Sequence, residues 1–212
     1  MRKILPALFC ICLCCAILGG CKGPRIDAAS SVKAIYDLYI LGDKSGILSL
    51  GMTEEDIAAA QRAYDDSLKE AIRTNFSASG QEIEENVLDE LCAARKKALA
   101  HMEATFETIE ESDGKATVVL HTTFFDEPAL DEEAYYNAKE AAQQGHFDTL
   151  EQQQAFLMDR YTQNLMEAYG DVVPSKETHE IQVECVIHNK IWVPANMSSF
   201  GGDLASAIAG QP

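Results

Sequence analysis

The spacing of apolar residues along this 212-residue chain changes between a helical and an extended pattern. Over residues 31–102, apolar side chains recur every three or four positions, the spacing of helices that bury one face. Over residues 104–125 they follow the two-residue spacing of β-strands, and both patterns return before the C-terminus. The pattern predicts an α+β fold, in which a helix-rich body packs on an antiparallel sheet.

Five to six helices are predicted from this spacing and from residues that favour helix ends. Gly42 ends the first helix, Thr53 caps the second, and Ser79 with Glu82 forms a capping box for the third. A short break separates the second and third helices, so we expect them to form an antiparallel hairpin. The predicted ranges are 31–41, 53–76, 79–102, 131–144, 148–170 and a final short helix capped by Ser198 or Ser199, with a loop at 43–52.

Three or four strands are predicted, in two hairpins. The first hairpin joins 104–110 to 115–125 through Asp113-Gly114, a pair typical of two-residue turns. The second joins 177–187 to 191–193 through a turn at 188–190. Alternation in 177–187 predicts that four side chains point inward, namely Ile181, Val183, Cys185 and Ile187.

The N-terminus has the features of an export signal. Arg2 and Lys3 precede an apolar run from residue 4 to residue 18, and two glycines follow the run. A positive start, an apolar stretch of ~7–15 residues and small residues at the cleavage site are typical of a secretory signal peptide. The run is shorter than the roughly 20 residues of a transmembrane helix. We therefore interpret residues 1–20 as a signal peptide.

The string Leu18-Gly19-Gly20-Cys21 resembles the lipobox of bacterial lipoproteins. This resemblance implies that Cys21 is acylated, becomes the first mature residue and attaches the protein to the lipid bilayer, outside the cytoplasm. Two acyl chains suffice for stable anchoring. Residues 21–29 would be the lipidated Cys21 and a short tether, whose eight residues 22–29 span at most about 28 Å, and a single domain would follow at 30–210. The alternative is an ordinary secretory signal with an incidental cysteine.

Removal of the signal changes the charge and the cysteine count. The mature chain would have 192 residues and a net charge of −19 instead of −17. This acidity argues against nucleic acid as a partner, because nucleic-acid binding requires Lys and Arg. Only Cys21, Cys92 and Cys185 would remain. Cys92 and Cys185 are either a disulfide or two buried free thiols, and we favour the thiols.

The motifs of common enzymes and metal sites do not occur in the sequence. The five histidines have no zinc-binding spacing, and no phosphate-binding or nucleophile motif is present, so we expect no metal, no cofactor and no catalytic residue. Candidate ligand contacts are Trp192, the chain's one tryptophan, and the strand histidines His121 and His188. The alternative roles are packing in the core for Trp192 and ordinary surface or hydrogen-bonded positions for the histidines.

Three segments resemble an uncharacterised domain of unknown function in lipoproteins of low-GC Gram-positive bacteria. They are residues 34–40, 50–55 and 190–196, together with Phe200 and Ile208. The resemblance covers most of 30–210 and implies no activity, so no site residue is transferred from it. The order of elements also resembles cystatin-like folds related to nuclear transport factor 2.

Two functions of different classes follow from these observations. The first is a non-catalytic, membrane-anchored module that binds an extracytoplasmic protein, peptide or envelope component. The alternative is a small-molecule pocket protein or enzyme of the cystatin-like type. A cavity with convergent polar groups and a titrating residue of shifted pKa would favour the alternative, and a filled interior would favour the first.

Overall fold

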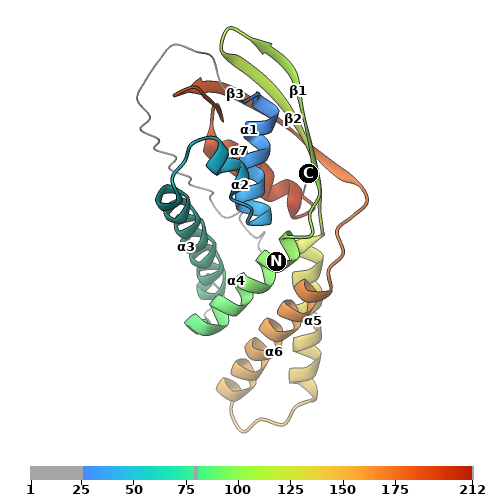
Figure 1. Cartoon of the computed structure of the whole chain (residues 1–212). Coiled ribbons are helices and arrows are strands. Elements are labelled where there is room, and N and C mark those ends of the chain that lie inside the picture. Colours follow the sequence, from blue (N-terminus) through green and yellow to red (C-terminus); the bar gives the residue numbers. More distant parts are fainter. Residues whose placement is uncertain (1–25, 79–80, 212) are drawn as a thin grey trace.

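The computed structural model describes residues 26–78 and 81–211 of the chain (Figure 1). These residues form an α+β fold of helices and one antiparallel sheet, as predicted. The strands are β1 (Ala104–Ser112), β2 (Lys115–Thr123), β3 (Thr178–His188) and β4 (Ile191–Pro194). The helices are α1 (Ala28–Tyr36), α2 (Ser45–Ser49), α3 (Glu54–Ala78), α4 (Glu85–Leu99), α5 (Glu127–Gln144), α6 (Leu150–Asp171) and α7 (Met197–Ile208), with a π-helical segment η1 (Asp37–Leu41) after α1.

The sheet has the order β1-β2-β3-β4, and all neighbouring strands are antiparallel. Asp113 and Gly114 connect β1 to β2 with φ angles of 49° and 76°. Positive φ at both positions is the geometry that Asp-Gly favours in two-residue hairpins, so this turn confirms the prediction. β2 and β3 are neighbours in the sheet although α5 and α6 lie between them in the sequence (Figure 1).

One face of the sheet is apolar and lies against α1 and α7. Leu120 of β2 is paired with Ile181 of β3, and Val118 with Val183, so these side chains share that face. Ile181, Val183 and Cys185 are buried, as predicted, but Ile187 is 39% exposed. Ile187 is paired with the buried Trp192 and so shares this face, but it lies beside Gly114, before β2 begins, and stays partly exposed.

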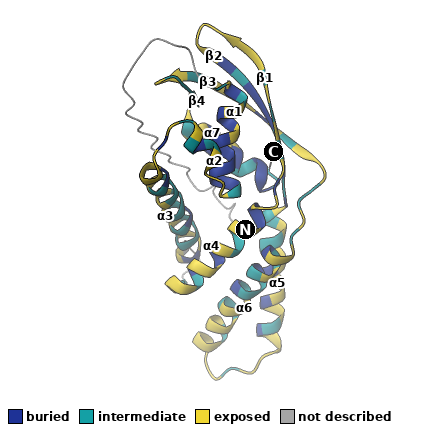
Figure 2. Ribbon diagram, in the orientation of Figure 1, coloured by how far each residue is buried: buried dark blue, intermediate teal, exposed yellow. Residues whose placement is uncertain are grey.

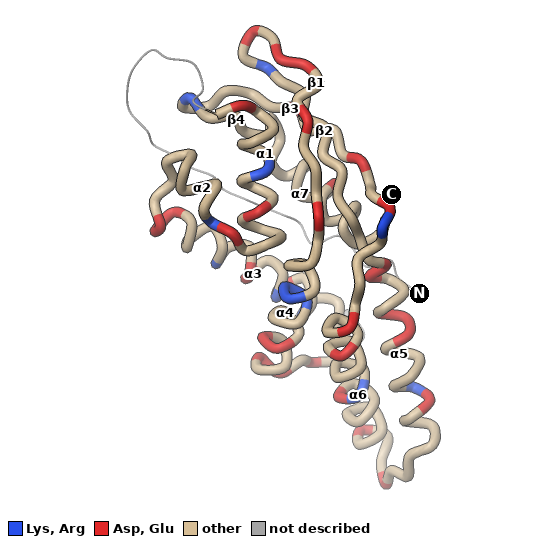
Figure 3. The backbone as a smooth tube through the Cα atoms, turned by 45° about the vertical axis from the view of Figure 1, so that its right-hand side comes forward, with Lys and Arg blue, Asp and Glu red and all other residues tan. Residues whose placement is uncertain are grey.

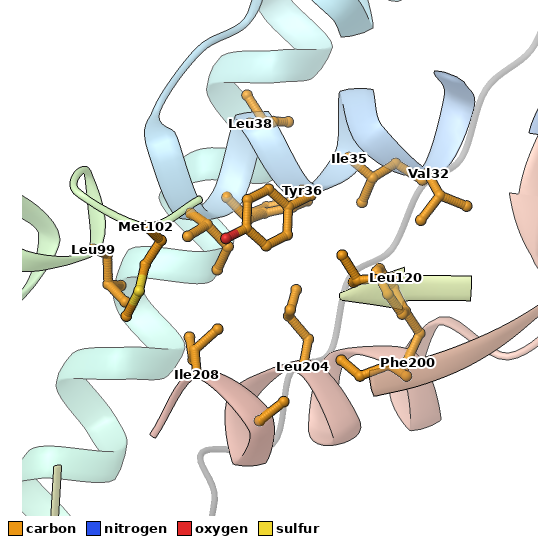
Figure 4. Packing of buried hydrophobic residues seen from close by; sticks show 14 of the residues in the cluster. Val32, Ile35, Tyr36, Leu38, Leu99, Met102, Leu120, Phe200, Leu204 and Ile208 are labelled. Carbon is orange, nitrogen blue, oxygen red and sulfur yellow. The ribbon is translucent and has the colours of Figure 1, made fainter. Parts of the chain in front are cut away.

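The main core fills the space between this face and the helices. Figure 4 shows side chains of α1, η1, β2 and α7 meeting there, with Leu99 and Met102 entering from the end of α4. Within it, the buried hydroxyl of Tyr36 lies 2.9 Å from Oγ1 of Thr122. The ring of Tyr36 also packs edge-on against Phe106 of β1, with centroids 5.5 Å apart.

The first helix starts earlier than predicted and changes geometry before it ends. The side chain of Asp27 accepts a hydrogen bond from the amide of Ser30, so α1 begins at Ala28, within the segment expected to be tether. The helix then continues as η1 and stops at Gly42, which has a φ of 73°. The predicted stop at Gly42 is confirmed, and the predicted loop that follows contains the short helix α2.

The other helix starts also differ from the predictions in detail. Thr53 accepts a hydrogen bond from the amide of Asp56, as expected for the cap of α3. α4, however, begins at Glu85, six residues later than predicted, and Ser79 of the predicted capping box lies outside the described residues. At the starts of the other long helices, a side chain before the helix accepts a hydrogen bond from a backbone amide of its first turn. Asp126 caps α5, Thr149 caps α6, and Asn196, not Ser198 or Ser199, caps α7.

Two helical hairpins lie below the sheet in Figure 1. Ion pairs of Lys69 with Asp89, Arg73 with Glu85 and Lys96 with Asp65 join α3 to α4 and confirm their antiparallel arrangement. The α5–α6 hairpin extends away from the sheet, and its far end is largely exposed (Figure 2). Acidic residues are spread over the sheet and the helices with few basic residues among them (Figure 3). Among the described residues, none of the helices combines the length and the apolar character that a membrane span requires.

Candidate functional site

A cavity of about 160 Å³ lies among the helices, lined by residues of η1 and of α3 to α7. Most of its surface is apolar. A cavity of about 150 Å³ is known to admit benzene, so this space is large enough for a small organic molecule. Its apolar lining includes Ile40, Leu68, Ile72, Phe76, Leu91 and Leu165.

A buried ion pair forms part of the cavity wall. Nε and Nη2 of Arg95 donate hydrogen bonds of 2.6 and 3.0 Å to Oε1 and Oε2 of Glu127. The side chains of Arg95 and Glu127 are only 12% and 17% exposed. Two parallel hydrogen bonds of this kind form the strongest geometry of an Arg–carboxylate pair. Tyr169 of α6 donates a further hydrogen bond to Glu127, so three helices meet at one carboxylate.

The pair keeps both of its members charged. Burial alone would raise the pKa of Glu127, but the guanidinium of Arg95 and the hydrogen bonds from Arg95 and Tyr169 outweigh burial and lower it. Burial likewise works against the charge of Arg95, and the carboxylate of Glu127 more than compensates, so the pKa of Arg95 is raised. The positive and negative charges of this pair therefore cancel inside the cavity wall.

A second carboxylate, Asp131, lies one helical turn after Glu127 on α5. It accepts a hydrogen bond from the hydroxyl of Tyr161 on α6. Burial raises the pKa of Asp131, the hydrogen bond from Tyr161 partly offsets this, and the charges of Glu127 and Glu132 raise it further. Burial and the neighbouring Asp131 both raise the pKa of Tyr161, so its hydroxyl stays protonated as the donor.

Aromatic side chains complete the wall. Four of the described lining residues are aromatic, namely Tyr64, Phe76, Tyr161 and Tyr169. The rings of Phe76 and Tyr161 lie with centroids 5.9 Å apart. The π-helical turn η1 also contributes, because it places Ile40 in the lining and packs the ring of Tyr39 against Tyr64. π-Helical turns occur frequently at functional sites.

Trp192 is a core residue in this structure. Its side chain is 1% exposed and belongs to the main core cluster, and it does not line the cavity. Its Nε1 has no hydrogen-bond partner within the described part of the chain. Packing in the core, the alternative considered above, is therefore the role that its surroundings show.

His121 and His188 do not meet. His121 alternates with Leu120 and Thr122, so it lies on the sheet face opposite the helices, and it pairs with Glu180. His188 lies eight positions further along β3 than Glu180. At a rise of about 3.3 Å per residue, the two histidines are roughly 26 Å apart along the sheet. Neither histidine lines the cavity, so their role as ligand contacts stays a prediction.

The remaining predicted residues lie apart from the cavity. Cys21 lies outside the described residues. Cys92 of α4 and Cys185 of β3 are free and buried in two different apolar clusters, which agrees with their interpretation as apolar side chains. Burial raises the pKa of both thiols, to about 12 for Cys185. In the residues that the structure describes, no cluster of three or more His, Cys, Asp or Glu is arranged to hold a metal.

Sequence reasoning missed the charged residues of the cavity. Arg95 lies four positions after Leu91, on the stripe that otherwise carries the apolar residues of α4. A charged residue on an apolar stripe is a detectable signal for a buried polar partner. Glu127 was missed for a different reason, because the predicted start of that helix at residue 131 left it outside the helix.

Comparison with known proteins identifies one similar fold. No protein-family model matches the sequence, and no curated protein matches it. The crystal structure of ycdA from Bacillus subtilis, a provisionally assigned lipoprotein, superimposes with a TM-score of 0.62 at 15% identity. The match covers 85% of this chain and 55% of ycdA, so this chain spans little more than half of that protein's length. At this identity the likeness shows a shared fold. Fold and site together define an α+β domain with a cavity of ligand size.

Proposed function

We propose that this chain is a lipid-anchored protein outside the cytoplasm and that its α+β domain binds a small molecule in the cavity. The observation that carries the proposal is an apolar, aromatic-lined space of about 160 Å³ with three ionisable carboxylate and guanidinium groups in one wall. Apolar pockets with a few convergent polar groups and shifted pKa values are typical of ligand sites. This arrangement favours the pocket alternative over a module with a filled interior.

The role proposed for the cavity is binding without catalysis. Arg95 and Glu127 neutralise each other, and Tyr161 and Tyr169 already donate their hydroxyl protons to carboxylates. No histidine or cysteine is found among the described lining residues, so the wall lacks the usual pairing of a nucleophile with a base.

The membrane anchor is supported by the N-terminal sequence. Leu18-Gly19-Gly20-Cys21 follows a signal-like apolar run, and the structurally similar ycdA carries a lipoprotein assignment. Mass spectrometry of the mature N-terminus tests this part. We expect a diacylglycerol-modified Cys21 as the first residue. An unmodified thiol at Cys21, or a mature chain that starts elsewhere, would contradict the anchor.

Filling the cavity tests the binding function. Ala71 lines the cavity on α3, and Ala63 lies on the exposed side of the same helix. Benzene should raise the melting temperature of the mature, membrane-extracted protein, because a ligand that binds only the folded state stabilises it. The same rise is expected in Ala63→Phe and should be absent in Ala71→Phe. An equal rise in both variants, or none in the unaltered protein, would count against the cavity as the site.

A second candidate is contact with a protein partner through the α5–α6 hairpin. Four large apolar side chains are exposed there, namely Tyr135, Tyr136, Leu150 and Phe156. Exposed apolar patches of this kind mark interaction sites. Chemical cross-linking in intact membranes should give a defined adduct that Tyr136→Ser with Leu150→Ser removes, and an unchanged adduct would reject this surface.

A further inference from the structure

We propose that the cavity selects a small organic ammonium ion, with its nitrogen against Asp131 and its apolar body between the aromatic side chains. This inference rests on the binding function proposed above and names the class of ligand. Its basis is the charge, the free hydrogen-bonding capacity and the shape of the cavity wall.

The charge of the wall favours a cation. Among the described lining residues, Arg95, Glu127 and Asp131 carry charge, and the first two form a bidentate pair. Because that pair is neutral as a unit, Asp131 supplies the uncompensated charge. The chain as a whole has 34 acidic and 17 basic residues, which raises the local concentration of cations at the cavity mouth.

Asp131 also has an acceptor to spare. Its Oδ1 accepts the hydrogen bond from Tyr161, and Oδ2 accepts no hydrogen bond from the described residues. An ammonium N–H can donate to Oδ2 while Tyr161 holds the carboxylate in place. A ligand carboxylate attracted to Arg95 would instead compete with Glu127, to which Nε and Nη2 of Arg95 are already bound.

The aromatic residues suit the rest of such a ligand. A cation within about 6 Å of an aromatic ring is attracted to its face, and cages of aromatic side chains recognise ammonium ligands. Tyr161 is both a ring of the wall and the hydrogen-bond donor to Asp131, so it joins the cation site to the apolar space. The volume of the cavity limits the apolar body to about the size of a benzene ring.

The titratable groups around Asp131 predict how binding depends on pH. Glu127 and Glu132 lie near it on α5, Tyr161 faces it from α6, and Arg95 of α4 is engaged with Glu127. Burial raises the pKa of Asp131, so the carboxylate becomes protonated at a higher pH than an exposed aspartate. Affinity for an ammonium ion should therefore fall on acidification before ordinary aspartates titrate.

Three probes that share one ring and differ in charge test the proposal. Benzylammonium, benzyl alcohol and phenylacetate are titrated calorimetrically into the mature, membrane-extracted protein, with a detergent blank. We expect benzylammonium to bind at least tenfold more tightly than benzyl alcohol, and phenylacetate to bind more weakly than both. Asp131→Asn should reduce the preference for benzylammonium to about twofold or less. Glu132→Gln, which removes the same charge from an exposed neighbour, should keep it.

The outcomes separate this inference from the binding function. Equal affinity for benzylammonium and benzyl alcohol would overturn the inference and leave the cavity as a binding site for neutral molecules. Tighter binding of phenylacetate would overturn it in favour of Arg95 as the anchor. If Glu132→Gln also lost the preference for benzylammonium, that preference would be a general effect of charge, and the inference would be overturned. No binding of any probe would overturn both the inference and the binding function. Fluorescence of the buried Trp192 checks that each variant is folded.

Discussion

The hydroxyl of Tyr169 donates a 2.5 Å hydrogen bond to Oε1 of Glu127, the oxygen that also accepts Nε–H of Arg95. Tyr169 belongs to α6, Glu127 to α5 and Arg95 to α4, so this carboxylate ties three helices together beside the cavity. Breaking this contact would lower the stability of the fold strongly, because a buried charge that loses its partner is left without solvent or counter-charge.

Glu127→Gln should therefore destabilise the fold strongly. The amide retains an oxygen for Tyr169 but cannot neutralise Arg95, and breaking a buried ion pair in this way costs about 3–5 kcal/mol. Urea unfolding followed by Trp192 fluorescence measures the loss. Glu54→Gln is the control, because Glu54 faces Lys44 in an exposed pair and its loss should change stability little. A similar, small effect for both variants would show that Arg95 finds solvent or another partner.

The same pair should make the protein sensitive to acid. The pKa of Glu127 is lower in the folded protein than its ordinary value of 4.5, so the folded state binds this proton less readily than the unfolded state. Its contribution to stability is complete above about pH 4.5 and is lost as the pH falls through the lowered pKa. The free energy of unfolding measured from pH 7 to pH 3 should fall in this range, and this component should be missing in Glu127→Gln.

Asp131→Asn is expected to have the opposite effect on stability at neutral pH. Burial raises the pKa of Asp131, so its ionisation opposes folding above that pKa. Asparagine keeps an acceptor for Tyr161 and removes the charge. The variant should melt at a higher temperature at pH 7, and the difference should shrink as acid protonates Asp131 in the unaltered protein. A lower melting temperature at pH 7 would mean that the charge stabilises the fold.

The buried hydroxyls of Tyr36 and Thr122 should be coupled. Thr122 donates its proton to the carbonyl of Thr123 at 3.0 Å, so Tyr36 is the donor in the 2.9 Å contact between the two hydroxyls. Thr122→Val leaves the Tyr36 hydroxyl without an acceptor and should cost about 1–3 kcal/mol. The double variant with Tyr36→Phe should be more stable than Thr122→Val alone, because it removes the stranded donor. Urea unfolding of the four proteins forms the cycle, and additive effects would contradict the coupling.

Cys92 and Cys185 should be unreactive in the folded protein. Both are buried, and burial raises the pKa of both, so little thiolate forms at neutral pH. Iodoacetamide should leave the peptides of both cysteines unmodified under native, non-reducing conditions and alkylate both in denaturant. Resistance in denaturant that a reductant abolishes would instead indicate a disulfide.

Local patterns were sufficient to predict the α+β class and much of its detail. Gly42 and Asp113-Gly114 adopt positive φ where the prediction needed them, and alternation in β3 correctly buried Ile181, Val183 and Cys185. These features depend on the nearest few residues, so the sequence expresses them directly. Helix starts were predicted less well, because several residues near a helix end can cap it and the surrounding packing selects one.

Local patterns were not sufficient to predict the candidate site. Trp192, His121 and His188 were chosen for their residue types, but one lies in the core and the two histidines lie on the outer face of the sheet. The cavity instead depends on Arg95, Glu127 and Tyr169. Arg95 and Glu127 are 32 residues apart in the sequence, and Glu127 and Tyr169 are 42 residues apart. No local spacing relates residues so distant from one another.

The sequence by itself therefore predicts an export signal and an acylation site at Cys21, and it determines the acidic charge and the alternation of helices and strands, because each depends on composition or on neighbouring residues. The tertiary structure decided which polar side chains are buried together and where the interior is left unfilled. The physical reason is the position of the α5–α6 hairpin, which lies between β2 and β3 in the sequence and packs α6 against α4. This packing brings Glu127 and Asp131 to the cavity wall, which Arg95 and the tyrosines complete.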